Sequence, residues 1–147
     1  MKRQRNTKRK NAFTLVELMA VLLIIGLLAA IAMKNFMGTT DKAAVTTTKA
    51  NLSMLHEAVM MFKLDTGRYP AEELGLLELV EEPTDVEGWQ PGGYLKTTEI
   101  PFDAWNYEFI YQLNPESGKP FVIISYGADG EEGGEEYDAD LYSTDAN

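Results

Sequence analysis

The chain has 147 residues and a formal charge of −10, which allows one small domain and one additional segment. Six of its thirteen basic residues lie within the first ten positions, so residues 13–147 hold seven basic and twenty-three acidic side chains, a balance of −16. Such a surface repels nucleic-acid phosphates and argues against DNA or RNA as a partner. No cysteine is present, which excludes a disulfide framework and thiol catalysis.

Residues 1–12 form a basic leader, which is typical of an orientation signal that keeps the N-terminus cytoplasmic. The twenty-one residues from Phe13 to Met33 contain one charged side chain, Glu17. As a helix this run spans about 31 Å, enough to cross a bilayer. No Ala-x-Ala pattern follows it, which argues against a cleaved secretory signal. We therefore expect a transmembrane or assembly helix over residues 13–37.

The next segment, residues 38–64, has the pattern of an amphipathic continuation of the same helix. Its apolar residues recur at spacings of three and four, the period of one helix face. They are Leu52, Leu55, Val59 and Phe62, with Ala58 and Met61 beside them. The other face is polar, so the apolar stripe requires a partner surface. Gly67 and Pro70 predict the end of the helix.

Residues 65–147 are expected to form a small head that supplies this surface. Residues 71–80 have the pattern of a short helix, with Leu74, Leu77 and Val80 facing inward. Residues 107–113 and 120–126 have strand composition and flank a turn, which predicts an antiparallel hairpin. An isolated hairpin is marginal in water, so its apolar face should lie on the helix stripe. The fold class is therefore α+β, a long N-terminal helix packed on a head with a short antiparallel sheet.

Glu17 is the most informative residue of the chain. A carboxylate in hydrocarbon costs about 2.5 to 3.5 kcal/mol on insertion scales, so an acid in the apolar run needs a function. The junction Ala12-Phe13-Thr14-Leu15-Val16-Glu17 resembles the processing site of type IV pilins and of type II secretion pseudopilins. The resemblance implies that a prepilin peptidase cuts between Ala12 and Phe13 and that the new amine of Phe13 is methylated. Glu17 would then neutralise the Phe13 amine of a neighbouring subunit during assembly.

Segments far from this junction also resemble one branch of that superfamily, the major pseudopilin of type II secretion. The matching residues are 63–70, 73–76, 79–80, 92–95, 100–101, 103–105, 125–130, 133–134 and 138–141. Three positions depart from the family pattern, since Ala12 stands where glycine is usual and Ala104 and Lys34 each stand where proline is usual. Lys34 keeps a backbone donor that proline lacks, so the helix should continue through this position.

The resemblance implies a structural subunit that polymerises after leader cleavage into a pseudopilus, which drives export of folded proteins across the outer membrane. Its implied partners are copies of itself, minor pseudopilins, the prepilin peptidase and the inner-membrane assembly platform. The implied location is the bacterial inner membrane, with the head in the periplasm. Three alternatives stay open: a type IV pilin of a surface filament for adhesion or motility, a minor pseudopilin located at the tip of the fibre, and a membrane-anchored calcium-binding module that does not polymerise.

The acidic, glycine-rich C-terminal loop is a candidate calcium site, because calcium takes six to eight oxygen ligands from flexible loops. From the residues alone, a solvated acidic tail is an equal interpretation. The resemblance implies a structural Ca²⁺, held by carboxylates and backbone carbonyls. The implied ligands are the carboxylates of Asp129, Asp138 and Asp140 and the carbonyls of Tyr126 and Glu131.

No pattern of a catalytic site is recognisable, and we expect no enzymatic activity. The chain has no set of Ser, His and Asp residues at catalytic spacing, no phosphate-binding glycine loop and no zinc spacing. His56, the single histidine, is interpreted as a surface or subunit-contact residue, and Arg68 as a partner in a structural ion pair. The aromatic residues Trp89, Tyr94, Trp105 and Tyr107 are expected to pack under loops rather than to bind a ligand.

Overall fold

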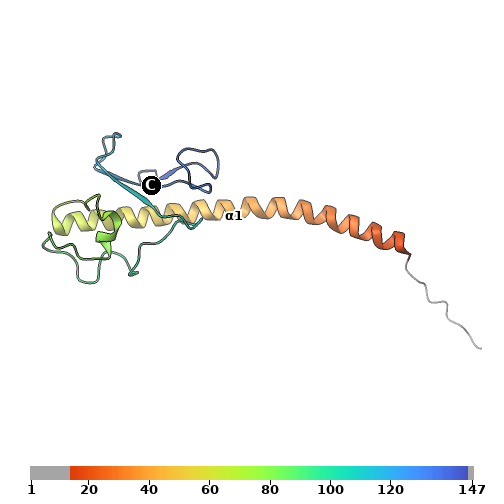
Figure 1. Ribbon diagram of the computed structural model, residues 1–147, viewed down its shortest axis with the longest axis horizontal. Coiled ribbons are helices and arrows are strands. Elements are labelled where there is room, and N and C mark those ends of the chain that lie inside the picture. The colour runs from red at the N-terminus through yellow and green to blue at the C-terminus, as the bar shows by residue number, and fades with distance from the viewer. Residues whose placement is uncertain (1–13, 146–147) are drawn as a thin grey trace, which may run out of the picture. The chain divides into compact units, whose positions relative to one another are not determined.

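The computed structural model describes residues 14–145, and of residues 32–39 only the backbone. The elements in chain order are the α-helix α1 (Leu15–Thr66), the 3₁₀-helix η1 (Gly75–Leu79) and three strands, β1 (Ile110–Leu113), β2 (Phe121–Ser125) and β3 (Leu141–Tyr142) (Figure 1). The chain divides into two compact units, Met1–Thr39 and Thr40–Asn147. As predicted, α1 continues through Lys34 and ends one residue before Gly67.

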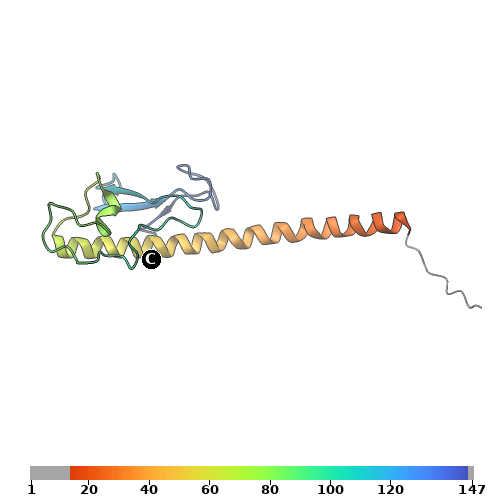
Figure 2. The same ribbon diagram turned by 60° about the horizontal axis from the view of Figure 1, so that its bottom comes forward.

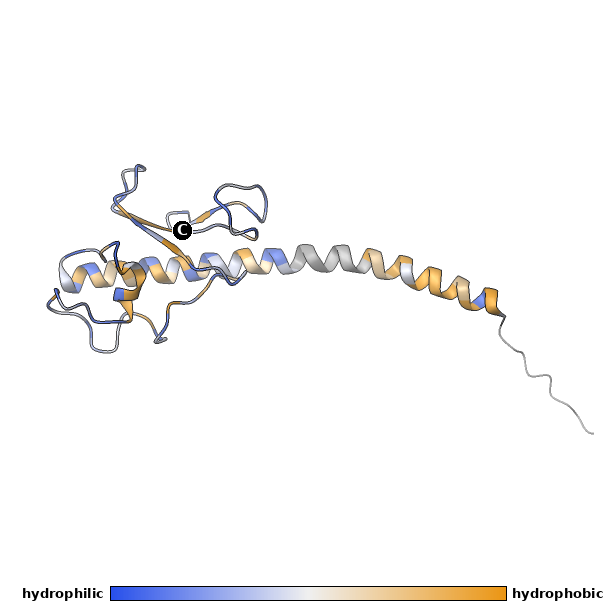
Figure 3. Ribbon diagram, viewed as in Figure 1, coloured by the Kyte–Doolittle hydropathy of each residue, from blue (hydrophilic) through white to orange (hydrophobic). Residues whose placement is uncertain are grey.

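Residues 15–31 of α1 are apolar on all sides apart from Glu17 in the first turn (Figure 3). Twelve large apolar side chains between Leu15 and Ile31 are each at least 48% exposed. Among the residues that the structure describes, no helix is both long enough and apolar enough to cross a membrane. Phe13 and the side chains of residues 32–37, which belong to the expected membrane segment, lie outside the described residues.

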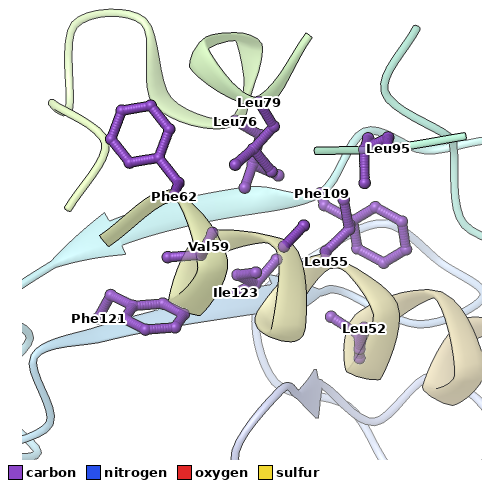
Figure 4. Close-up of a cluster of buried hydrophobic side chains, with 11 residues drawn as sticks. Leu52, Leu55, Val59, Phe62, Leu76, Leu79, Leu95, Phe109, Phe121 and Ile123 are labelled. Carbon is purple, nitrogen blue, oxygen red and sulfur yellow. The ribbon is translucent and has the colours of Figure 1, made fainter. Parts of the chain in front are cut away.

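In the second unit, the C-terminal half of α1 packs against the head (Figures 1 and 2). The predicted stripe is buried, and Leu52, Leu55, Val59 and Phe62 are fully inaccessible to solvent. Figure 4 shows these side chains meeting leucines of η1 and apolar side chains of the head, including Phe109, Phe121 and Ile123. Burial of one such side chain contributes about 1.5–3 kcal/mol, so the stripe is a main source of the stability of the head.

The segment predicted as a short helix over residues 71–80 contains instead a single 3₁₀ element, η1, and the predicted inward face was wrong at Leu74 and Leu77 but right at Val80. Leu74 and Leu77 are about half exposed, whereas Leu76 and Leu79 are buried and Val80 packs against the core. Gly75, the first residue of η1, adopts a φ of 54°, a left-handed conformation that side-chain-bearing residues avoid, so residues 71–80 do not form one regular helix. In a 3₁₀-helix residues i and i+3 share a face, which places Leu76 and Leu79 together on the core.

The three strands form an antiparallel sheet in the order β1-β2-β3. The predicted hairpin is confirmed, with Leu113 opposite Phe121 and Ile110 opposite Ile124. All five residues of β2 are buried because this strand is central and also faces α1. The short strand β3 was not predicted, and it pairs Leu141 with Ser125 and Tyr142 with Ile124.

Candidate functional site

The N-terminus of α1 presents Glu17 in a reciprocal hydrogen-bonded cap with Thr14. The Thr14 backbone N–H and hydroxyl each donate to Glu17 Oε2 at 3.0 Å, and the Glu17 backbone N–H donates to Thr14 Oγ1 at 3.2 Å. This arrangement is a capping box, in which an N-cap threonine and a glutamate three residues later satisfy the free donors of the first turn. The Thr-Leu-Val-Glu spacing in the sequence carries this signal. Glu17 therefore also stabilises its own helix.

The predicted cleavage site beside this cap, Ala12 and Phe13, lies outside the described residues. Within them, the Glu17 carboxylate is solvent-exposed and lies in the first turn of α1. A negative charge is favourable there because the helix dipole places partial positive charge at the N-terminus. The side chain is thus positioned at the end of the helix, where an amine could approach it.

The residues predicted to bind calcium lie in one loop between β2 and β3. The Tyr126–Asp129 part lies beside residues 137 and 138, since the Ala128 N–H donates to the Tyr137 carbonyl at 2.9 Å. Asp129 Oδ1 accepts the backbone N–H of Glu131 at 3.1 Å, and both side chains are exposed. The loop is therefore a folded structure that brings its two arms together, rather than an extended tail.

The second arm of this loop is fastened through Asp140. Asp140 Oδ1 accepts the Gly133 N–H at 3.0 Å, and the Asp140 N–H donates to the Gly133 carbonyl at 3.1 Å. Asp140 Oδ2 accepts the Tyr142 hydroxyl at 3.0 Å. The pKa of Tyr142 is raised mainly by burial and secondarily by this hydrogen bond. The phenol therefore stays protonated and donates its hydrogen bond to Asp140. Asp138 is exposed, and its carbonyl faces Gly134.

This loop offers the oxygen ligands that calcium requires, but its carboxylate side chains do not converge on one point. All five predicted ligands offer oxygen, the atom that hard cations prefer. Nevertheless, no three acidic or histidine side chains in the described part of the chain form a group that could hold a metal ion. Oxygen ligands from backbone carbonyls would have to supply much of any coordination shell.

A second loop, residues 101–107, is fastened to β2 by Asp103, which is 6% exposed, and to α1 by Ala104. Asp103 Oδ1 accepts the backbone N–H groups of Trp105 and Tyr107 at 3.0 and 2.8 Å, and Oδ2 accepts the Ser125 hydroxyl at 2.6 Å. The N–H of Ala104 donates to the buried Thr48 hydroxyl at 3.1 Å. Proline at position 104 would lack this donor, so the departure from the family pattern creates a hydrogen bond to α1.

Arg68 forms the predicted structural ion pairs. Its guanidinium lies 2.7 Å from a carboxylate oxygen of Glu78 and 2.9 Å from one of Asp85. The Glu78 side chain is 2% exposed, and hydrogen bonding to it raises the pKa of Arg68. The carbonyl of Glu78 accepts the indole N–H of Trp89 at 2.8 Å. The importance of Glu78 was not predicted, because its partner is ten residues away and the surrounding glutamates are exposed.

His56 is partly buried in the head and contacts it through one side of its ring. Its ring lies 4.7 Å from that of Phe121, and Nδ1 is 3.4 Å from Ser143 Oγ. Desolvation lowers the pKa of His56, partly offset by the nearby charge of Glu57. Phe121 and the C-terminal segment cover one side of its ring, so His56 is only partly at the surface, and its interpretation as a subunit-contact residue stays a prediction.

The predicted role of the aromatic residues is confirmed at two places. Trp89 and Tyr94 meet edge to face at 6.0 Å, and Tyr94 meets Phe62 in the same manner at 5.5 Å. The ring of Tyr107 lies against Gly130 of the C-terminal loop. These residues connect loops to the core.

Comparisons with known proteins agree with this architecture and these motifs. Residues 35–144 match the family model of type II secretion system protein G, and residues 7–33 match the prokaryotic N-terminal methylation motif. The type II secretion system core protein G of Pseudomonas aeruginosa is 39% identical over 94% of this chain and 97% of its own length, and that of Vibrio cholerae is 36% identical over 91% of each. The crystal structure of the major pseudopilin from the type 2 secretion system of enterohaemorrhagic Escherichia coli has a TM-score of 0.61 at 30% identity, covering 74% of this chain and 92% of that one.

A long α-helix with a methylation motif at its start and a small α/β head is a pilin-like architecture, and the structural match is to a major pseudopilin. The chain belongs to the type II secretion system protein G family. This membership favours the secretion pseudopilin over a type IV pilin of a surface filament and over a non-polymerising calcium-binding module.

Proposed function

We propose that this chain is the major structural subunit of a type II secretion pseudopilus, and that it polymerises after its leader is removed. The observation that carries the proposal is the exposed apolar surface of α1 between Leu15 and Ile31. A helix that is apolar on all sides requires an apolar environment. Before assembly this would be the inner membrane, and afterwards the same helices of other subunits, together with minor pseudopilins and the assembly platform. The role is structural, with no chemical step in the subunit.

The N-terminal cap suggests how Glu17 takes part in assembly. Removal of the leader would leave a positively charged amine on Phe13, four residues before Glu17. A carboxylate held at the first turn by Thr14 is oriented before a neighbouring subunit arrives, which reduces the entropy lost when the two charges pair. Glu17 would then have two roles, a cap within the subunit and a counter-charge between subunits.

Two variants separate these roles. Glu17→Gln keeps a capping side chain, because glutamine also serves at this position of a capping box, but it removes the charge. Thr14→Ala removes the cap and keeps the charge. We expect Glu17→Gln to abolish pseudopilus formation and secretion while the helix is retained, and Thr14→Ala to weaken assembly less. Normal assembly of Glu17→Gln would exclude the proposed pairing.

Processing is tested by mass spectrometry of the subunit from cells with and without the prepilin peptidase. A methylated chain that begins at Phe13, present only with the peptidase, is the expected result. A chain that keeps residues 1–12 in assembled fibres would contradict the proposed maturation. Retention in the membrane fraction after alkaline washing tests the proposed membrane location of the unassembled subunit.

We further propose a structural Ca²⁺ in the loop between β2 and β3, with Asp129, Asp138 and Asp140 and the carbonyls of Tyr126 and Glu131 as its ligands. The loop supports this proposal because it already brings its two arms together and because its donors are oxygens. Ca²⁺ would neutralise part of the acidic charge of the loop, allowing two acidic heads to lie side by side in a fibre.

The calcium proposal is tested by thermal unfolding of the full-length chain in nonionic detergent with Ca²⁺ or with chelator. We expect Ca²⁺ to raise the melting temperature, and Asp129→Asn to abolish that response. The exposed Glu116, outside the loop, provides the matched control as Glu116→Gln. An unchanged melting temperature at millimolar Ca²⁺ would exclude a structural site.

A further inference from the structure

The head carries an apolar groove with an acidic rim on the side where η1 faces the start of β1. Its volume is about 490 Å³, within the range of about 300–1,000 Å³ that is usual for ligand sites in proteins. Three segments line it: residues 72–81 with η1, residues 98–102, and residues 108–111 at the start of β1. Leu76 and Phe109 are buried here, whereas Leu74, Leu77 and Phe102 are each between 45% and 49% exposed. The groove therefore offers apolar surface to a partner.

The charge around this groove has one sign. The lining residues include five glutamates and no basic side chain, and the glutamates are Glu72, Glu73, Glu81, Glu99 and Glu108. All five are exposed, and none belongs to an ion pair within residues 14–145, where the ion pairs are those of Arg68. Glu72 Oε1 accepts the Leu113 N–H at 3.1 Å and so has a structural role in addition. The field at the groove attracts cations.

The spacing of these carboxylates indicates whether the groove can bind a single metal ion or a chain with several positive charges. No three acidic side chains among the described residues converge as a metal ion requires. The glutamates instead lie along three separate segments around an apolar centre. Such a pattern fits a chain that carries several positive charges and also places apolar side chains between Leu74, Leu77 and Phe102.

A second copy of this head is a poor occupant of the groove on the same grounds. Residues 40–147 hold six basic and twenty-two acidic side chains, so a second head has few basic side chains to place beside the five glutamates of the groove. We propose that the groove binds a basic, apolar-anchored peptide segment of another protein, with lysine or arginine beside the acidic rim and leucine-like side chains in the groove. The groove lies wholly in residues 40–147, so its binding does not depend on the proposed polymerisation, and either proposal could fail without the other.

The test uses the full-length chain in nonionic detergent and a short fluorescein-labelled peptide of alternating lysine and leucine, followed by fluorescence anisotropy. One variant combines Glu73→Gln, Glu81→Gln and Glu99→Gln. Its matched control combines Glu87→Gln, Glu116→Gln and Glu132→Gln, which change the net charge equally at exposed positions outside the groove. A second pair is Leu77→Ser in the groove and Leu64→Ser on the exposed surface of α1.

We expect the groove variants to weaken peptide binding by about ten-fold or more and both controls to change it less than about two-fold. A peptide of alternating lysine and serine should bind at least about ten-fold more weakly than the leucine peptide. The proposal would be overturned if the groove and control variants lost equal peptide affinity, or if the serine peptide bound as tightly as the leucine peptide. Either result would mean that the net negative charge of the head attracts the peptide, rather than the groove. Self-association that competes with the peptide and is lost in Leu77→Ser would assign the groove to a second copy and overturn it as well.

Discussion

Loss of the Arg68 guanidinium should destabilise the head more than any change to an exposed ion pair. Glu78 is 2% exposed and its carboxylate lies 2.7 Å from Arg68, so Arg68→Met would leave a buried charge without a counter-ion. Breaking a buried pair in this way costs about 3–5 kcal/mol. The second partner, Asp85, is 68% exposed, and a pair of that kind contributes at most about 1 kcal/mol. Nearly all of the loss should therefore come from Glu78.

The measurement is urea unfolding followed by tryptophan fluorescence, because both tryptophans, Trp89 and Trp105, lie in the head. We expect Arg68→Met to lower the free energy of unfolding by about 3–5 kcal/mol and Asp85→Asn by at most about 1 kcal/mol. The double variant Arg68→Met/Glu78→Leu should recover most of the loss, because it removes both charges and leaves apolar side chains. A loss below about 1 kcal/mol for Arg68→Met, or a double variant less stable than either single one, would refute this reasoning.

Three further predictions concern the contacts of the loops. Because burial lowers the pKa of His56, the unfolded chain binds a proton more readily than the folded chain does. Stability should therefore fall as the pH is lowered from about 7.5 to about 5.5. His56→Gln should flatten this pH dependence, as measured by the midpoints of urea unfolding. Ala104→Pro should destabilise the head by about 1–2 kcal/mol, because the buried Thr48 hydroxyl loses its hydrogen-bond donor. Adding Thr48→Val should restore the stability. An Ala104→Pro variant that is more stable than the unchanged chain would contradict this prediction. Gly134→Ala should lower the melting temperature, because the new Cβ would lie 2.3 Å from the Asp138 carbonyl oxygen and because φ at this position is 80°. Gly118→Ala is the control: this position also has a positive φ but lies in open space, so the variant measures the effect of φ alone.

The sequence was sufficient wherever a period or a turn signal was local. The spacing of Leu52, Leu55, Val59 and Phe62 identified the buried face of α1, and the turn between the two strand-like runs identified the hairpin. These signals work because helix and strand place side chains on one face at fixed intervals. The Thr14–Glu17 cap was not predicted, although its four-residue pattern is present in the sequence.

What the sequence did not reveal depends on contacts between distant residues or on backbone conformation. Glu78 looks like its exposed neighbours until Arg68 and Trp89 are placed around it. Leu74 and Leu77 were misassigned to the inward face because one regular helix was assumed across Gly75, whose positive φ a periodicity cannot register. The strand β3 has two residues, too few for an alternation pattern, and forms because β2 has an unpaired edge.

The pairing of Leu141 with Ser125 has a consequence for the fifteen residues between them. The two ends of this loop are held by adjacent strands, so the entropy of loop closure is already lost when the sheet forms. Lengthening such a loop is inexpensive, since each doubling costs only about 0.6 kcal/mol. The exposed position Glu132 in this loop is therefore a place where this fold can acquire new sequence while its core stays unchanged.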